Sequence, residues 1–163
     1  YLPTFRPRRM EGRIESIHVA PEATEPVESR ESVEAVAGKG LRGDRYFDAE
    51  GTFSDATEGG NELTLVEREA VAAIERESGI ELEPGEHRRN LTTEGVALNH
   101  LVGERFRVGE AVCRGVRLCE PCSHLESLTE EGVVAALTHR GGLRADIEEA
   151  GEIRVGDTVE RIE

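Results

Sequence analysis

Short runs in which apolar and polar residues alternate dominate this chain and predict mostly β-structure. The clearest run extends from Arg13 to Val19, carries β-branched residues and ends before Pro21. Further short runs that predict strands occupy residues 33–36, 62–66, 105–108, 112–118 and 154–162. Val108-Gly109 and Val155-Gly156 are each followed by an acidic residue and a further β-type run, which indicates two turns of the same kind.

One segment has the different periodicity of a helix, between Glu67 and Ser78. Its apolar residues fall on one stripe, acidic residues occupy its first turn, and Gly79 follows where a helix commonly ends. Residues 22–32 are acidic and polar and predict a loop, as do residues 48–60. Many short strands with one or two helices predict a mainly β, α+β fold, a closed or partly closed β-barrel.

The length of the chain, 163 residues, suits one domain with a sizeable core. We assign residues 12–163 to that domain and treat residues 1–11, which contain two prolines and three arginines, as a flexible arm. No apolar run approaches the ~20 residues of a membrane span, and residues 1–11 lack the apolar core of a signal peptide. The expected location is therefore the cytoplasm.

The charge balance is strongly acidic, with 34 Asp and Glu against 20 Lys and Arg and a net charge of −14. Such a surface repels nucleic-acid phosphates and anionic lipid, so we expect neither nucleic acid nor a membrane as a partner. Abundant carboxylates are typical of a halophilic protein, adapted to high salt. No P-loop and no G-x-G-x-x-G after a strand is present, which disfavours nucleotide-dependent catalysis.

The segment Cys119-Glu120-Pro121-Cys122-Ser123-His124 carries the most informative chemistry, because a thiol after a strand can ligate a metal, form a disulfide or act as a nucleophile. Three interpretations stand at this point. Cys113, Cys119, Cys122 and His124 could hold a structural zinc ion, and Cys119 with Cys122 could form a redox pair. In the third, Cys122 is a single reactive thiolate, and His124 assists its deprotonation. The alternative for Cys113 is a purely structural role as a small buried apolar residue.

A second group consists of Arg88, Arg89 and Asn90 with Thr92, on a polar segment. Guanidinium groups can bind the phosphate or carboxylate of a ligand. The alternative is that they only neutralise neighbouring carboxylates on the protein surface. Asp44 and Arg45 follow a Gly-rich stretch, where they could line a site or form an ordinary turn salt bridge. His18 and His100 lie in apolar patterns and are expected at the edge of the core.

Four of these motifs, in this order, resemble the MOSC domain, the C-terminal domain of molybdenum-cofactor sulfurases. They are Gly38–Tyr46, Glu62–Glu67, Arg88–Gly95 and Glu120–Cys122, and the resemblance covers about residues 12–162. It implies a β-rich barrel around one functional cysteine, at the position of Cys122. That cysteine either ligates molybdenum in a bound pterin cofactor (molybdopterin) or carries a persulfide received from a pyridoxal-phosphate-dependent cysteine desulfurase.

The resemblance also implies roles for other residues. The Arg-x-Asn element, which maps onto Arg88 to Asn90, contacts the phosphate and pterin of the cofactor, and Gly43-Asp44-Arg45 lines the same cleft. We expect two departures from the family, namely no N-terminal barrel domain like that of the reductase relatives and no fused desulfurase domain. We therefore expect a stand-alone cofactor-binding or sulfur-carrier domain, a sulfur transferase or part of a molybdenum-dependent reductase system. A desulfurase or a molybdoenzyme is its expected partner, and pyridoxal phosphate enters only through the former. The alternatives are a zinc-stabilised non-catalytic module and a thiol-disulfide oxidoreductase.

Overall fold

The computed structural model describes residues 11–21, 27–44, 47, 59–82, 85–120, 125, 129 and 131–162. Its first strands are β1 (Glu11–Val19), β2 (Glu28–Arg30), β3 (Ser32–Val36), β4 (Gly40–Leu41) and β5 (Leu63–Glu67). Then follow α1 (Arg68–Ser78), β6 (Leu91–Glu94), the 3-10 helix η2 (Leu98–Leu101), β7 (Arg105–Val108) and β8 (Ala111–Leu118). The last elements are α3 (Val133–Leu137), β9 (Leu143–Glu149), β10 (Gly151–Arg154) and β11 (Thr158–Ile162).

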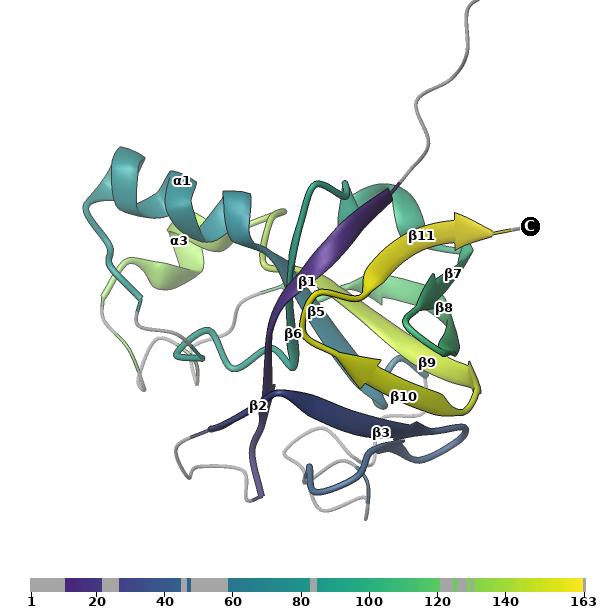
Figure 1. Cartoon of the computed structure of the whole chain (residues 1–163). Coiled ribbons are helices and arrows are strands. Elements are labelled where there is room, and N and C mark those ends of the chain that lie inside the picture. The colour runs from purple at the N-terminus through teal and green to yellow at the C-terminus, as the bar shows by residue number, and fades with distance from the viewer. Residues whose placement is uncertain are drawn as a thin grey trace, which may run out of the picture.

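Seven strands form a closed barrel, which confirms the predicted fold class. The order is β11-β7-β8-β9-β5-β6-β1, and β1 pairs back onto β11 (Figure 1). Neighbouring strands of the barrel are antiparallel, except that β5 and β6 are parallel and are joined by a crossover through α1. A crossover of this kind is what two parallel neighbours require. Outside the barrel, β10, β3 and β4 form a separate three-stranded sheet.

The interior of the barrel follows from the period of two in its strands. Residues such as Ile14, Ile17, Leu65 and Phe106 are at most 2% exposed and belong to one apolar cluster. Helix α1 instead packs against α3 beside the barrel, through a second apolar cluster that includes Ile74 (Figure 1). Gly79 ends α1 in the left-handed conformation at φ 69°, as the sequence predicted.

Several expectations are corrected by the structure. Residues 22–32 were expected to be a loop, yet Glu28–Arg30 forms the exposed edge strand β2 by pairing with β1. Strand β9 and helix α3 were not predicted. His100 is exposed on η2 rather than at the core edge, whereas His18 is buried as expected. Most of the predicted loop at 48–60, and residues 1–10 of the predicted arm, lie outside the described residues.

Across the described part of the chain, no helix has both the length and the apolar character needed to cross a lipid bilayer.

Candidate functional site

A line of polar residues crosses the outer surface of the barrel, and we call it the polar row: Arg117, Arg144, Thr64, Asn90 and His18. Strand register places Arg117 directly opposite Arg144, and Arg144 directly opposite Thr64. Leu143 and Ala145, on either side of Arg144, point into the apolar interior, so the alternation of the strand directs Arg144 outward. The row ends where the backbone N–H of His18 donates to the carbonyl of Asn90 at 2.7 Å.

Thr64 and Asn90 lock the centre of the polar row. The Asn90 backbone N–H donates to Oγ1 of Thr64 at 3.0 Å, and that hydroxyl donates to Oδ1 of Asn90 at 3.1 Å. The same Oδ1 accepts the backbone N–H of Thr64, and Nδ2 of Asn90 donates to the carbonyl of His18. Both side chains are buried, and these bonds satisfy their polar atoms. Asn90 therefore fixes the approach of the chain to β6 against β5 and β1.

Arg89 is the buried cation of this region, with 8% of its surface exposed. Its Nε donates to the carbonyl of Gly141 at 2.8 Å and its Nη2 to the carbonyl of Cys119 at 2.9 Å. Its Nη1 donates to the carbonyl of His87 at 3.1 Å. One guanidinium thus joins the end of β8, the start of β9 and the segment that enters β6.

The ring of His87 has one assigned tautomer. Its Nδ1 accepts the backbone N–H of Arg89 at 3.0 Å, so Nε2 carries the proton and donates it to Oγ1 of Thr92 at 3.0 Å. Burial, reinforced by the charge of Arg89, lowers the pKa of His87 to about 3. His18 meets this ring edge-on at 6.0 Å between centroids, and burial lowers the pKa of His18 as well. Both imidazoles are neutral at pH 7.

Backbone strain gathers beside Arg89. Of the residues that the structure describes, Arg88 (φ 61°) and His139 (φ 64°) are the only non-glycine residues with positive φ. The carboxylate of Glu120, the residue that follows Cys119, accepts the backbone N–H of His139 at 3.0 and 3.1 Å. Side chains in the left-handed region are costly and concentrate at functional sites. Arg88 adjoins Arg89 in the chain, and His139 lies two residues before Gly141, whose carbonyl accepts from Arg89.

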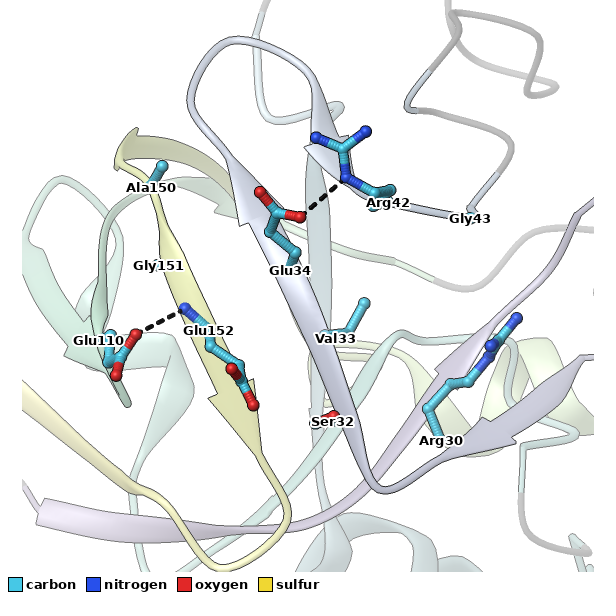
Figure 2. Close-up of a pocket in the computed structure, with 10 residues that line it drawn as sticks. All are labelled: Arg30, Ser32, Val33, Glu34, Arg42, Gly43, Glu110, Ala150, Gly151 and Glu152. Atoms are coloured by element: carbon cyan, nitrogen blue, oxygen red, sulfur yellow. Dashed lines mark hydrogen bonds and ion pairs between the residues drawn. The ribbon is translucent and has the colours of Figure 1, made fainter.

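Asp44 connects this region to the second sheet. It is 3% exposed, and its Oδ1 accepts the backbone N–H of Ala20, just beyond the end of β1, at 2.8 Å. Arg42 and Gly43, which precede it, line a hollow of about 770 Å³ over β3 and β10 (Figure 2). In this hollow Arg42 pairs with Glu34 at 2.9 Å. In this turn Asp44 therefore contacts the chain at the end of β1, and Gly43 lines the hollow.

The three cysteines have different positions. Cys113 lies in the apolar interior of the barrel, where burial and nearby carboxylates raise the pKa of its thiol. This confirms its interpretation as a small buried residue. Cys119, 1% exposed, follows β8, and its backbone N–H donates to the carbonyl of Gly142 at 2.7 Å. Cys122 and His124 lie outside the described residues, as does Arg45. No group of three metal-ligating side chains occurs within the described ranges.

Of the predicted site residues, the structure connects Arg89 to Thr92 through the buried ring of His87, and the neighbouring Asn90 bonds with Thr64. Arg88 is half-buried next to them. Sequence reasoning missed Thr64, His87, Arg117 and Arg144. The outward positions of Arg117 and Arg144 follow from strand alternation, but the register that sets them opposite each other needs the folded barrel.

Comparison with known proteins agrees with this architecture. The chain aligns over 94% of its length with the YuaD protein of Bacillus subtilis, covering 97% of that chain, at 18% identity and a TM-score of 0.75. It is also similar to YiiM from Escherichia coli, with 17% identity, a TM-score of 0.67 and coverage of 94% and 70%. YiiM from Geobacillus stearothermophilus gives 16% identity, a TM-score of 0.67 and coverage of 93% and 75%. At these identities the likeness shows the fold.

None of the curated proteins matches the sequence. The sequence model of the MOSC domain, however, matches residues 16–160, nearly the whole chain. The closed barrel and the ordered motifs agree with that match, and the chain belongs to the MOSC domain family.

Proposed function

We propose that this chain is a molybdenum-cofactor-binding or sulfur-carrier domain in which Cys122 is the working thiol. Membership of the MOSC family supports a role related to the molybdenum cofactor. The observation that places the site near Arg89 in this proposal is the 2.9 Å hydrogen bond from Nη2 of Arg89 to the carbonyl of Cys119. It anchors the Arg-x-Asn element to the backbone that leads into the Cys122 segment.

Chain connectivity supports a common site for the two elements. Cys122 follows Cys119 by three residues, so peptide geometry keeps the two Cα atoms within about 11 Å. Among the described residues, three of the five N–H groups of Arg89 bind backbone carbonyls. In this proposal the other two would donate to an anionic group. Arg89 would therefore both position the start of this segment and attract a negatively charged ligand or thiolate.

The donor chemistry of this face fits a phosphate-bearing pterin. Arg88 and Arg89 concentrate positive charge on a chain whose net charge is −14, and they lie beside the amide of Asn90 and the hydroxyl of Thr92. Guanidinium groups suit phosphate, and a soft thiolate suits molybdenum. When bound, the metal would supply redox chemistry. The protein would hold the phosphate through Arg88 and Arg89, shape the cleft through Asp44 and Arg45, and ligate the metal through Cys122.

The sulfur-carrier role needs the same thiol and no metal. The Cys122 thiolate attacks the terminal sulfur of a persulfide on a donor protein, and the S–S bond of that persulfide breaks. The donor leaves as a thiolate, and Cys122 becomes the persulfide. His124 would accept the proton of the Cys122 thiol before the attack. A cysteine desulfurase would supply the sulfur, and a molybdoenzyme would accept it.

The test compares three single variants made in cells that synthesise the cofactor: Cys122→Ser, Cys119→Ala and Cys113→Ala. Mass spectrometry measures persulfide on the chain, and elemental analysis measures bound molybdenum and zinc. Cys122→Ser should lose persulfide and molybdenum, whereas Cys113→Ala, the control inside the barrel, should retain what the unmodified chain carries. Unchanged values for Cys122→Ser would overturn the proposal.

The alternatives have their own outcomes in this experiment. A zinc-stabilised module predicts about one zinc ion per chain and unfolding on chelation. The interior position of Cys113 and its raised thiol pKa disfavour it as a zinc ligand. A thiol-disulfide oxidoreductase predicts that Cys119→Ala loses function as fully as Cys122→Ser does.

A further inference from the structure

We propose that the outer edge of β2 (Glu28–Arg30) is an interface at which two copies of this chain pair, strand against strand, about a two-fold axis at Ser29. Strand β2 comes last in the order of the eight-stranded sheet, and among the described strands it pairs with β1 alone (Figure 1). All three of its residues are exposed. The inference rests neither on Cys122 nor on the proposed function.

The hydrogen bonds of β1 show which backbone groups of β2 face outward. Register sets His18 of β1 opposite Ser29 of β2. The N–H of His18 donates to the carbonyl of Asn90 at 2.7 Å, and the carbonyl of His18 accepts from Nδ2 of Asn90 at 3.2 Å. Both backbone groups of His18 therefore point away from β2, so His18 and Ser29 form the kind of antiparallel pair that exchanges no hydrogen bonds. The N–H and C=O of Ser29 consequently point away from β1, toward the open edge.

The outward groups of Ser29 are available to a further strand. Within the described ranges, neither its N–H nor its C=O has a hydrogen-bond partner. An exposed strand edge with an unpaired donor and acceptor is a template for pairing with another chain. In an antiparallel pair centred on this residue, Ser29 of each copy would donate its N–H to the carbonyl of Ser29 in the other copy. This reciprocal exchange is what a two-fold axis generates.

The charges of β2 select a second copy of this chain as the partner. About that axis, Glu28 of one copy lies opposite Arg30 of the other, and the symmetry repeats the contact. Within one copy, Nη2 of Arg30 donates to Oε2 of Glu28 at 2.7 Å. That bond leaves Nε and Nη1 of Arg30 to donate to Glu28 of the second copy. Pairing would thus join alternating charges into one network, and networks contribute more than isolated surface ion pairs.

Strand β10 provides an internal contrast, because it has the same Glu-x-Arg pattern on an edge that is already occupied. Nε of Arg154 lies 2.6 Å from Oε1 of Glu152. The N–H of Glu110 donates to the carbonyl of Glu152 at 3.1 Å, and the N–H of Glu152 donates to Oε1 of Glu110 at 3.2 Å (Figure 2). The chain itself therefore fills the outward edge of β10. Its charged pair supplies the matched control for β2.

The size and charge of the edge determine the conditions of the test. An edge of three residues buries little surface, so the association should be weak and should depend on protein concentration. Copies with a net charge of −14 repel each other over long distances. At about 0.15 M salt this repulsion is screened beyond about 8 Å. Opposed side chains on paired strands lie closer than that, with Cβ atoms about 5 Å apart, so their attraction persists.

The test is sedimentation equilibrium of the whole chain at rising concentration, in which the unmodified chain should show a monomer–dimer equilibrium. Glu28→Arg and Arg30→Glu each set like charges opposite each other twice, and each should raise the dissociation constant at least about tenfold. In an equimolar mixture of these two variants, every opposed pair again has opposite signs. The mixture should therefore associate at least about tenfold more tightly than either variant alone.

Two further sets of variants separate backbone pairing from general charge effects. Ser29→Pro removes the outward N–H and leaves the bonds between β2 and β1 in place, so it should weaken dimerisation at least about tenfold. Circular dichroism verifies that each variant is folded. The controls Glu152→Arg and Arg154→Glu change charge equally on β10, and each should dimerise as the unmodified chain does.

An unmodified chain that stays monomeric at every concentration would overturn the pairing of copies and leave the β2 edge to an extended segment of another protein. Equal loss in the β10 controls, or no gain in the mixture of Glu28→Arg with Arg30→Glu, would overturn the assignment to β2. Cys122→Ser should dimerise unchanged, so a failure of the proposed thiol chemistry is distinguishable from a failure of this inference.

Discussion

The backbone N–H of Arg89 donates to Nδ1 of His87 at 3.0 Å, and this bond assigns the proton of the buried ring to Nε2. The neighbouring guanidinium and the surrounding protein both oppose a second proton. Burial and the charge of Arg89 therefore keep His87 neutral in the folded chain, so a change in pH that protonates the unfolded chain should alter stability.

Folding should become less favourable as the pH falls from about 6.5 towards 3. The pKa of His87 is about 3 in the folded chain, against an ordinary value of 6.5, so only the unfolded chain takes up this proton in that range. The loss amounts to about 1.4 kcal/mol per pH unit. Above pH 6.5 both states are neutral, and His87 adds no pH dependence.

His87→Asn provides the comparison, because its Oδ1 can replace Nδ1 as the acceptor for Arg89. Urea unfolding between pH 7 and 5 should show a smaller fall in stability for the variant. The pKa of His18 is also lowered, so the variant retains that contribution. Equal pH dependence in both proteins would contradict the assigned state of His87.

Arg89→Met should destabilise the fold by about 3 kcal/mol or more. It removes the donors from three backbone carbonyls, and bonds to charged groups contribute about 1.5 to 3 kcal/mol each, although not additively. The control is Arg107→Met on β7, which is exposed. Urea denaturation measures both free energies of unfolding. A loss no larger than that of the control would show that Arg89 does not anchor these segments.

Thr64→Val should cost about 1 to 3 kcal/mol, because the near-isosteric side chain leaves the buried backbone N–H of Asn90 and its Oδ1 each without one partner. Thr158→Val on β11 is an exposed strand control and should change stability by about 0.5 kcal/mol or less. Thermal unfolding measures the melting temperatures of the two variants, and that of Thr64→Val should be the lower. Similar melting temperatures would argue against the Thr64–Asn90 lock.

Gly142→Ala tests the close approach between β9 and β5. A Cβ at this position would lie 2.0 Å from the carbonyl oxygen of Leu65, and φ is 120°. Gly38→Ala separates the two effects, since φ is 76° there and nothing lies within 4 Å. We expect a loss of about 1 kcal/mol for the control, from backbone strain alone, and about 3 kcal/mol or more for Gly142→Ala. Urea midpoints measure both; equal losses would refute the steric contact.

The local pattern of apolar and polar residues was sufficient to predict most of the strands and the helix after β5. The alternation of Arg13–Val19 became β1, and the stripe between Glu67 and Ser78 became α1 to within one residue. It was insufficient for β2, whose three residues are all exposed and which exists because β1 offers it a pairing edge. Polar residues on both sides of such a strand leave no alternation to detect.

For the candidate site, chemistry in the sequence identified Arg88, Arg89, Asn90 and Thr92, but not their partners. His87 accepts from Arg89, and Thr64 exchanges bonds with Asn90. The roles of Cys122, His124 and Arg45 remain predictions, because these residues lie outside the described ranges.

By itself the sequence determined which segments extend, where the main helix ends and which face of each strand is apolar, because these depend on neighbours within a few residues. Only the tertiary structure decided that Arg117 faces Arg144 and that Arg89 binds the carbonyls of Cys119 and Gly141. The physical reason is register. Closing the barrel fixes how far each strand slides along the next, and that shift brings together side chains whose separation in sequence carries no local signal.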